Sequence, residues 1–387
     1  MNRRMFLRNA NMAAVSLAAG GGLLGCVKRP VGAAIASAAL PMNLPETACH
    51  LPRVRVSAER EIRTVVGLRP YRPSGFRVAK EMVGGTAVVH NYGHGGGGIT
   101  LSWGTSKLAI DLGLAGHVGP VAVLGCGAVG LATARLAQEA GFDVTIYAKA
   151  LPPETTSNIA GGQWFPVSVF DPNRTLTPEF TQQFLAAAQY AYRRYQIMTD
   201  QKYGIRWMRN YALSDTPWHS SLDTGLYGLI QGLQPEIKDL PVGTHSFGNK
   251  FVRQFDGMIV EPPIYLPAML TDVRIAGGTI VVREMKSLDE VQSLPEKLVF
   301  NCTGLGAKAL FGDEELTPIR GQLTFLLPQP EVTYATTYEN TYMFSRRDGV
   351  VLGGTHEMGD WNLQPDMTTK AAILAKQAKL FDGMRDC

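Results

Sequence analysis

Short apolar runs alternate with segments of helical spacing along most of this chain. Three runs are typical of buried strands: residues 121–124 (VAVL), 144–147 (VTIY) and 298–301 (LVFN). Apolar positions at helical spacing occupy residues 131–140, and a stripe through Phe180, Phe184, Ala187 and Tyr190 predicts a helix over residues 178–195. Further strand-like runs stand at 86–90, 324–326, 342–344 and 350–352. The mixture predicts an α/β fold with a parallel sheet and a second, more antiparallel sheet.

The first 26 residues have the pattern of an export signal. The basic stretch 3–8 (RRMFLR) precedes an apolar run over residues 12–24. That run is too short for a spanning helix, which needs about 20 residues. The adjacent arginines are typical of a twin-arginine signal, which exports folded proteins. A plain secretory peptide and a chance arginine pair are the alternatives.

Residues 23–26 (LLGC) resemble a bacterial lipobox, in which cleavage leaves Cys26 as a lipidated N-terminus. Residues 27–52 are rich in alanine, contain several prolines and have no sustained apolar period, so we interpret them as a tether. These segments predict a protein of the bacterial periplasm or cell envelope, anchored to the membrane only at its N-terminus.

Composition excludes several classes of protein. Charged residues are 18% of the 387 residues, and the net charge of +4 comes from scattered basic residues, which excludes a nucleic-acid-binding surface. The five cysteines include no CxxC pair, which argues against a zinc ribbon, an iron–sulfur cluster and a disulfide-rich miniprotein. The 42 glycines have no Gly-X-Y period, so they exclude collagen and require a local explanation.

Residues 125–130 (GCGAVG) form a GxGxxG motif between an apolar strand and a predicted helix. The first glycine makes the turn, the second lets the backbone approach a pyrophosphate, and the third lets helix and strand pack closely. This context favours dinucleotide binding over a purely structural glycine turn. The next strand ends in Tyr147, Ala148 and Lys149, without the acid that usually binds a ribose hydroxyl. Lys149 either favours a 2′-phosphate or is simply solvated, and the motif alone does not separate FAD from a nicotinamide cofactor.

Several longer blocks resemble the D-amino-acid oxidase family and cover most of residues 60–387. They are 67–73 (GLRPYRP), 90–100 (HNYGHGGGGIT), 155–164 (TTSNIAGGQW), 301–304 (NCTG) and 320–322 (RGQ). Residues 352–363 (LGGTHEMGDWNL) resemble the D-aspartate oxidase branch in particular. The resemblance implies FAD, a Rossmann-like FAD-binding domain with a parallel sheet, and a substrate domain with a mixed or antiparallel sheet. It disfavours a nicotinamide-dependent dehydrogenase.

The order of the blocks departs from the family. The blocks at 67–73 and 90–100 normally follow the LGG…GDW block, whereas here they precede the GxGxxG motif. This order predicts a circular permutation, with residues 107–120 bridging the family's old termini. On this basis we expect the FAD-binding domain at 53–170, 296–312 and 349–387, and the substrate domain at 171–295 and 313–348.

The resemblance also implies roles for individual residues. Substrate contacts are expected from Arg69 and Tyr342 to the carboxylate, from the Gly96 carbonyl to the amine, from Tyr338 as a lid residue, and from His356. FAD contacts are expected from Gly125, Gly127, Ala128, Val129, Gly130, Thr155, Thr156, Ser157, Gly162, Gln163, Met285, Thr303, Gly95, Gly96, Gly98, Ile99 and Thr100. No residue is expected to act as an acid or base, because hydride leaves Cα of a neutral amine for the flavin. No metal is expected, since the glycines around His90 and His94 make a metal-binding helix improbable.

The implied reaction is oxidative deamination of a D-amino acid to a 2-oxo acid, ammonia and H₂O₂, with O₂ reoxidising the flavin. Neutral substrates are favoured, because Tyr338 follows the neutral-substrate branch, whereas His356 stands where the D-aspartate branch has an arginine. The alternatives are a D-aspartate- or D-glutamate-preferring oxidase, a membrane-anchored dehydrogenase that passes electrons to quinone, and a lipid-anchored binding protein that has lost the activity.

The cysteines separate by location. Cys126 and Cys302 lie in motifs expected to be buried and behave as small hydrophobic residues. Cys49 precedes the first block and Cys387 is the last residue. If the chain is permuted, the two lie close together, and a disulfide between them is expected to form outside the cytoplasm.

Overall fold

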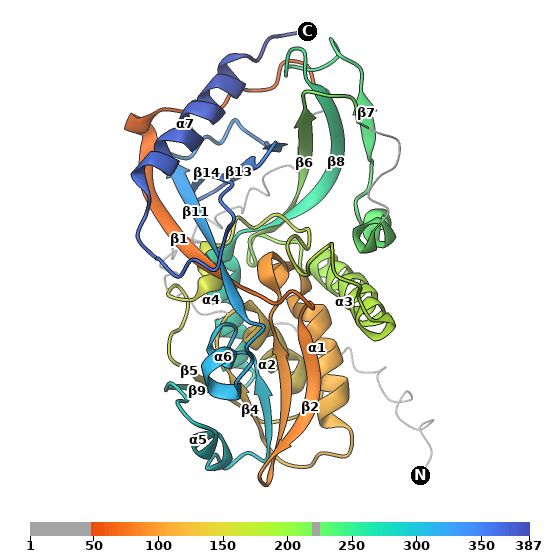
Figure 1. Cartoon of the computed structure of the whole chain (residues 1–387), viewed down its shortest axis with the longest axis vertical. Helices are drawn as coiled ribbons and strands as arrows, with labels where there is room; N and C mark the ends of the chain where they lie inside the picture. The colour runs from red at the N-terminus through yellow and green to blue at the C-terminus, as the bar shows by residue number, and fades with distance from the viewer. Residues whose placement is uncertain (1–47, 219–224) are drawn as a thin grey trace, which may run out of the picture. The chain divides into compact units, whose positions relative to one another are not determined.

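A computed structural model describes residues 48–218 and 225–387 (Figure 1). The predicted signal, most of the tether and the lipidation candidate Cys26 lie outside the described residues. Within the described part of the chain, no helix is long and apolar enough to cross a membrane. The described strands form two sheets.

The first sheet has six strands. Their order is β2 (Arg77–Val83), β3 (Thr86–Tyr92), β10 (Leu298–Asn301), β4 (Val121–Leu124), β5 (Val144–Ala148) and β9 (Thr279–Val282). Only β2 is antiparallel to its neighbour. The strands β4 and β10 are buried at every position, which explains their unbroken apolar sequences. The predicted parallel sheet is therefore present, with both faces covered.

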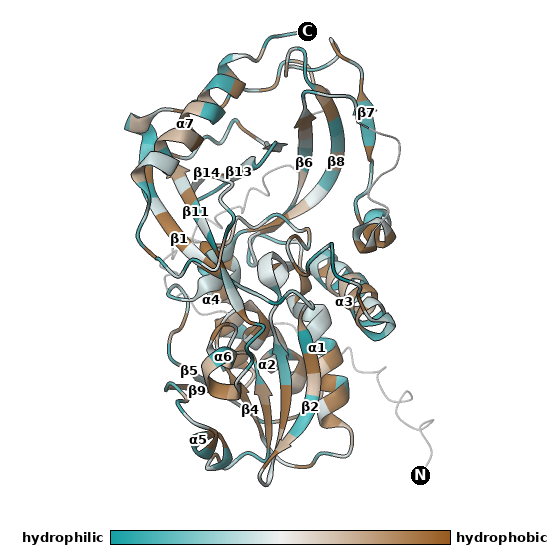
Figure 2. Ribbon diagram, viewed as in Figure 1, coloured by the Kyte–Doolittle hydropathy of each residue, from teal (hydrophilic) through white to brown (hydrophobic). Residues whose placement is uncertain are grey.

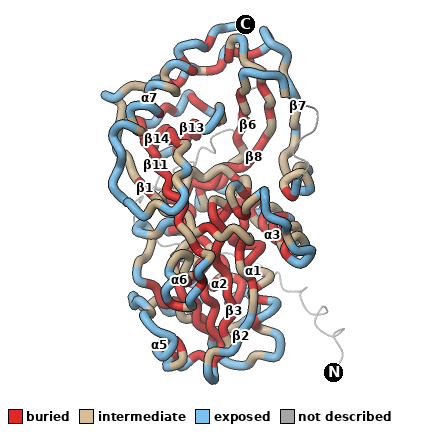
Figure 3. Tube along the Cα trace, viewed as in Figure 1, coloured by how far each residue is buried: buried red, intermediate tan, exposed pale blue. Residues whose placement is uncertain are grey.

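Helices cover the two faces of this sheet according to the alternation of its side chains. On one face, Val121, Val123 and Ile146 pack with α1 (Gly98–Leu114), α2 (Ala128–Glu139), α3 (Pro178–Ile197) and α4 (Pro262–Ile275). On the other face, Ala122 and Leu124 pack with the cluster that includes α5 (Leu288–Gln292) and α6 (Gly306–Phe311). Figures 2 and 3 show this region as largely hydrophobic and buried along its strands and around α1 and α2.

The predicted helix at 178–195 is α3. Thr177 caps it by accepting a hydrogen bond from the Phe180 N–H, and Pro178 occupies its first turn. Phe180, Phe184 and Ala187 of the predicted stripe are buried, and Tyr190 is partly buried. The apolar pattern thus identified the face of the helix that packs on the core.

The second sheet has nine strands and is mixed. Their order is β1 (Glu61–Tyr71), β11 (Thr317–Leu326), β14 (Gly349–Gly353), β13 (Thr341–Arg346), β12 (Tyr334–Tyr338), β6 (Ile205–Ser214), β8 (Phe251–Val260) and β7 (Lys238–Leu240), with β15 (Glu357–Met358) also paired to β11. All pairs are antiparallel except β12 with β6. One face is covered by α7 (Met367–Asp382), seen over the sheet in Figure 1. The opposite face carries Phe344, Phe325, Met208 and Tyr342.

The remaining described helical segments are short 3-10 turns. They are η1 (Ala58–Arg60), η2 (Gly95–Gly97), η3 (Thr156–Ile159) and η4 (Leu226–Leu233). Two of them, η2 and η3, belong to blocks that the sequence singled out.

The sheets divide the chain differently from the expected domains. The strands β1 and β14, expected in the cofactor-binding part, pair with β11 in the nine-stranded sheet, and β9, expected in the substrate part, pairs with β5 in the six-stranded sheet. The first half of the expected bridge at 107–120 is helical, because α1 extends to Leu114. The expected domains were drawn from motif blocks, which reflect contacts with a ligand. The sheets are defined by backbone hydrogen bonds between strands, so the domain division and the sheet division need not coincide.

Cys49 and Cys387, which are 338 positions apart in the sequence, form a disulfide in the structure, with Cα atoms 5.5 Å apart. The segments on either side are also held together. Arg53 donates to the Met384 carbonyl at 2.8 Å, and Ser246 bonds both ends, by donating its N–H to the Ala48 carbonyl and accepting from the Arg385 N–H. The two ends of the described unit therefore lie together beside α7.

Candidate functional site

The GxGxxG block forms the turn between β4 and α2. Gly125 has φ of +104°, and its N–H donates to the Tyr147 carbonyl at 2.8 Å. A Cβ at Gly125 would lie 2.6 Å from the Cys302 carbonyl oxygen, and one at Gly130 would lie 2.1 Å from the Gly125 oxygen. The first and third glycines are thus required by turn geometry and by close packing, as the motif predicts.

Hydroxyl groups gather at the N-terminus of α2. The Ala128 N–H donates to Ser157 Oγ at 3.0 Å, and a Cβ at Gly127 would approach the same oxygen. Thr155 Oγ1 bonds Asn158 at 2.8 Å at the start of η3, while Thr156 is exposed. The first turn of α2 and its adjacent hydroxyls make a surface suited to phosphate oxygens, because free N–H groups at a helix N-terminus attract anions.

The other expected FAD contacts follow neighbouring strands of the same sheet. Thr303 follows β10 and donates its hydroxyl to Asn301 Oδ1 at 2.7 Å. Met285 follows β9 and is partly buried against the cluster of Tyr147 and Leu124. Since these strands and β3 and β4 run parallel, their carboxyl ends share one edge, which is where open α/β sheets bind ligands.

The glycine run after β3 reaches the same edge. A Cβ at Gly95 would lie 1.8 Å from the Ser168 carbonyl oxygen, and one at Gly96 would lie 2.6 Å from that of Val167. These glycines therefore permit a close approach of the backbone at 167–168. Gly98, Ile99 and Thr100 form the first turn of α1, and a Cβ at Gly98 would meet only the His94 Cβ, at 3.9 Å.

Residues 160–163 lie against the nine-stranded sheet. Gly162 has φ of +99°, and a Cβ there would lie 2.3 Å from the Val260 carbonyl oxygen. Gln163 Nε2 donates to Asn210 Oδ1 at 2.8 Å. Arg346, which the sequence analysis did not single out, donates to the carbonyls of Ala160 at 2.8 Å and Gly161 at 3.2 Å.

The buried Arg346 side chain thus positions this expected flavin-contacting segment. It also pairs with Asp348 at 2.7 Å. No sequence signal identified Arg346, because its partners are backbone carbonyls nearly two hundred positions away.

Three of the five expected substrate residues meet on one face of the nine-stranded sheet. The Arg69 guanidinium lies over Gly321, where a Cβ would be 2.6 Å from its nitrogens, and Nη1 donates to the Thr355 carbonyl at 3.3 Å. The Tyr342 hydroxyl lies over Gly353, 2.5 Å from where a Cβ would stand. Burial raises the pKa of Tyr342, and the adjacent Arg69 opposes that rise. Glycines on the neighbouring strands therefore make the room in which these two donors converge.

His356 lies beside Arg69 and connects this face to the glycine run. Its Nε2 is 3.3 Å from Ser168 Oγ, and the Ser168 carbonyl accepts from the Gly96 N–H at 3.3 Å. Burial and then the charge of Arg69 lower the pKa of His356 below its ordinary value of 6.5. His356 is thus a neutral imidazole at pH 7, placed between the expected carboxylate and amine contacts.

The structure does not bring Tyr338 to the other expected substrate residues, because its side chain lies on the opposite face of the sheet. Tyr338 pairs with Thr341, whereas Tyr342 pairs with Thr337, and paired residues share a face. Its hydroxyl donates to Asp215 at 2.7 Å and accepts from Lys250 Nζ at 2.8 Å. The tyrosine belongs to the layer under α7.

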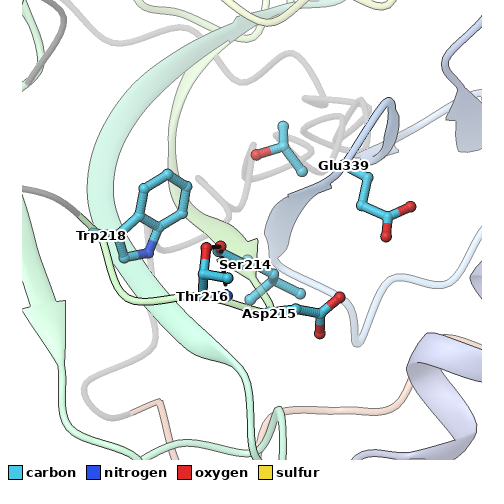
Figure 4. Close-up of a pocket in the computed structure, with 7 residues that line it drawn as sticks. Ser214, Asp215, Thr216, Trp218 and Glu339 are labelled. Carbon is cyan, nitrogen blue, oxygen red and sulfur yellow. Dashed lines mark hydrogen bonds between the residues drawn. The ribbon is translucent and has the colours of Figure 1, made fainter.

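A pocket of about 400 Å³ lies at the adjoining ends of β6 and β12 (Figure 4). Its lining is Leu213, Ser214, Asp215, Thr216, Trp218, Thr337 and Glu339. Figure 4 shows Trp218 and Glu339 on opposite sides of it. None of the expected substrate residues lines this pocket, so it is separate from the convergence of Arg69 and Tyr342.

We predict opposite outcomes for the two tyrosines. Tyr342→Phe removes a donor beside Arg69 and is expected to lower kcat/KM by roughly tenfold or more, the usual effect of a hydrogen bond to a charged group. Tyr338→Phe is expected to change it by less than about threefold. Steady-state kinetics on a D-amino acid measure both. A larger loss in Tyr338→Phe than in Tyr342→Phe would contradict the assignment of faces.

The histidines of the HNYGHGG block have structural partners. His90 lies between Glu81 at 2.8 Å and Asn301 at 3.0 Å, and His94 bonds Thr105 at 2.8 Å. Burial lowers the pKa of His94 to about 3, so it is neutral. Among the described residues, no group of histidines, cysteines and carboxylates could hold a metal ion.

Cys126 and Cys302 are buried free thiols whose pKa burial raises to about 12, as expected of small packing residues.

The residues at the carboxyl ends of the parallel strands of the six-stranded sheet fit FAD. The glycine turn and α2 offer N–H groups and hydroxyls for a pyrophosphate, and Gly161, Gly162 and Gln163 lead from that edge to the Tyr342 face. The exception is Lys149, which replaces the usual acid after β5 and lies 3.5 Å from Glu284.

Several known proteins are similar to this chain in sequence. The model of the family "DAO: FAD dependent oxidoreductase" matches residues 120–387. A D-amino-acid oxidase of Rubrobacter xylanophilus is 30% identical over 68% of this chain and 77% of its own length, and the human D-aspartate oxidase is 29% identical over 66% and 74%. A solved iminodiacetate oxidase of Chelativorans is 15% identical over 69% of this chain and 81% of its own, with a TM-score of 0.48. Because the family match spans more than two thirds of its residues, this chain belongs to the DAO family of FAD-dependent oxidoreductases.

Proposed function

We propose that this protein oxidises D-amino acids to 2-oxo acids and ammonia, with O₂ as the electron acceptor. The observation that carries the proposal is the convergence of the Arg69 guanidinium and the Tyr342 hydroxyl beside the expected flavin segment. Relatives named D-amino-acid oxidase and D-aspartate oxidase support the same substrate class.

The chain's own residues position the substrate. Arg69 holds the carboxylate through the planar fork of its guanidinium, which donates two parallel hydrogen bonds to the carboxylate oxygens where a lysine would offer a point charge. Tyr342 donates a further hydrogen bond to that carboxylate, and the Gly96 carbonyl accepts one from the amine. FAD, when bound, supplies the acceptor for the hydride that leaves Cα. Fixing Cα in this way removes orientational freedom before the reaction, and no side chain is required as a base.

The overall reaction consumes one amino acid, one water and one O₂ and yields one 2-oxo acid, one ammonia and one H₂O₂. The test is the visible flavin spectrum of the purified protein before and after anaerobic D-alanine, followed by H₂O₂ yield in air. Bleaching by D-alanine but not L-alanine, with about one H₂O₂ per substrate consumed, is expected. Rapid dye reduction without H₂O₂ would instead identify a dehydrogenase that uses another acceptor.

Within this reaction we propose a preference for neutral substrates. The support is His356, since a neutral imidazole beside Arg69 offers no cation to a second carboxylate. Tyr338 does not support this preference, because its side chain lies on the face opposite Tyr342.

The protonation of His356 predicts a pH dependence of specificity. Its lowered pKa means that the imidazole gains a proton only as pH falls below 6.5, and the cation then attracts an acidic side chain. The ratio of kcat/KM for D-aspartate to that for D-alanine is therefore expected to rise a few-fold between about pH 8 and about pH 5. In His356→Leu the ratio should stay flat. A preference for D-aspartate at neutral pH that is lost in His356→Leu would overturn the neutral preference.

We also propose that the chain is a circular permutant of the family. Its support is the position of the front blocks, since β1 pairs with β11 and β3 pairs in parallel with β10, far along the chain. The two ends of the described residues lie close together, with the Cα atoms of Cys49 and Cys387 5.5 Å apart, and a permuted chain requires its new ends to have been neighbours in a continuous one.

We also propose that the protein is exported by the twin-arginine route and lipidated at Cys26. The support is the basic pair, the short apolar run and the LLGC sequence. Cell fractionation, with metabolic labelling by a fatty acid, tests both. The label is expected in the membrane fraction of the full chain and absent from Cys26→Ala.

A further inference from the structure

The strand after the glycine turn, β5, does not end in an acid. In dinucleotide-binding sheets a carboxylate at this position accepts hydrogen bonds from ribose hydroxyls. Here β5 ends at Ala148 and Lys149 follows, whose ammonium can only donate hydrogen bonds. The residue that follows β5 therefore offers no side-chain acceptor to the expected adenosine.

The neighbouring strand brings a carboxylate to this place. β9 runs parallel to β5 with Val282 opposite Ala148, and the Arg283 N–H donates to the Ala148 carbonyl at 2.9 Å, which fixes the backbone beyond β9. The next residue is Glu284, whose Oε1 lies 3.5 Å from Lys149 Nζ. A carboxylate from β9 thus stands at the carboxyl end of β5.

The surroundings of Glu284 suit a ligand. The side chains of Lys149 and Glu284 are 71% and 51% exposed, so both are accessible. Met285, the next residue, is partly buried against the cluster of Tyr147 and Leu124, which anchors the segment to the sheet. The edge is the one at which Gly125 follows β4, and Gly125 itself bonds the Tyr147 carbonyl.

We propose that Glu284 accepts the hydrogen bonds of the adenosine ribose of FAD, and that Lys149 is a positioning residue that holds this carboxylate over the end of β5. The ion pair also bears on whether this site binds an adenosine with a 2′-phosphate or one with a 2′-hydroxyl. A 2′-phosphate at this place would meet the negative charge of Glu284, whereas a 2′-hydroxyl would donate to it. The pair therefore favours an adenosine with a free 2′-hydroxyl, as in FAD.

Binding without turnover tests the proposal. The full-length chain, stripped of flavin, is titrated with FAD and with the FAD analogue that carries 2′-deoxyadenosine, and flavin fluorescence reports the dissociation constants. The wild type is expected to bind FAD roughly tenfold more tightly than the analogue, as for a hydrogen bond to a charged acceptor. In Glu284→Ala the ratio is expected to fall to about one. A matched control is Glu314→Ala, which removes an exposed carboxylate paired with Lys308 and should keep the wild-type ratio.

A second variant relocates the carboxylate. Glu284→Ala combined with Lys149→Glu places an acid directly after β5 and is expected to recover the preference for FAD. A wild type that does not distinguish the two flavins, or a Glu284→Ala variant that keeps the wild-type ratio, would overturn the assignment. The inference depends on FAD as cofactor and not on the proposed substrate, so its failure and that of the D-amino-acid reaction are distinguishable.

Discussion

Arg69→Leu is expected to abolish most of the activity while leaving the flavin in place. The guanidinium lies over Gly321, beside the Tyr342 hydroxyl that lies over Gly353, so it is placed to bind a carboxylate through two parallel N–H groups. Removal of one partner of a desolvated charge pair costs about 3–4 kcal/mol, which is roughly a 10²- to 10³-fold loss in kcat/KM. Steady-state kinetics with a neutral D-amino acid measure it.

The conservative variant separates charge from geometry. Arg69→Lys keeps the charge but loses the planar fork, so it should recover only part of the loss. The visible flavin spectrum and the melting temperature of each variant serve as controls, because Arg69 lies in β1, at the edge of the nine-stranded sheet. Near wild-type kcat/KM in Arg69→Leu would refute its role as the carboxylate anchor.

Replacing both Cys49 and Cys387 by serine is expected to destabilise the fold by about 2–5 kcal/mol, as loss of a native disulfide does. The bond spans 338 positions and holds the two ends of the described unit beside α7. Without the disulfide, the unfolded chain has a higher conformational entropy, because the bond no longer closes this large loop, and the folded state is less stable relative to it. The midpoints of thermal and denaturant unfolding, measured under oxidising conditions, report the change.

Reductant provides the matched control. Treatment of the wild type should lower its unfolding midpoint to that of the double variant, and the double variant should not respond. Activity at low temperature is expected to persist in both, because α7 covers the face opposite Tyr342. Equal midpoints for oxidised wild type and variant would show that the bond adds no stability.

Much of the site was predictable because its signals are local. The positive φ of Gly125 and the close approach of Gly130 to the Gly125 oxygen arise within one β–turn–α unit, so the GxGxxG spacing specifies them. The buried strands β4 and β10 match the predicted runs residue for residue, since parallel strands covered on both faces must be apolar throughout.

Tyr338 illustrates why the rest could not be predicted. A spacing of four places two residues on the same face within one strand, but Glu339 and Asn340 turn the chain between β12 and β13. Across that two-residue turn Tyr338 pairs with Thr341, so Tyr342 faces the other way. A family motif indicates which positions of the sequence correspond. The length of the turn between the two strands decides which face of the sheet the side chains at those positions occupy.

The sequence by itself determined the α/β class, the cofactor-binding turn and the family blocks that carry Arg69 and Tyr342, because these depend on short-range spacing and residue chemistry. It also suggested the pairing of Cys49 with Cys387 through the order of its blocks. Only the tertiary structure decided that Arg346 holds the backbone at 160–161 and that Glu284 stands at the end of β5. Those contacts join residues more than a hundred positions apart, and sheet pairing, which no local pattern encodes, brings them together.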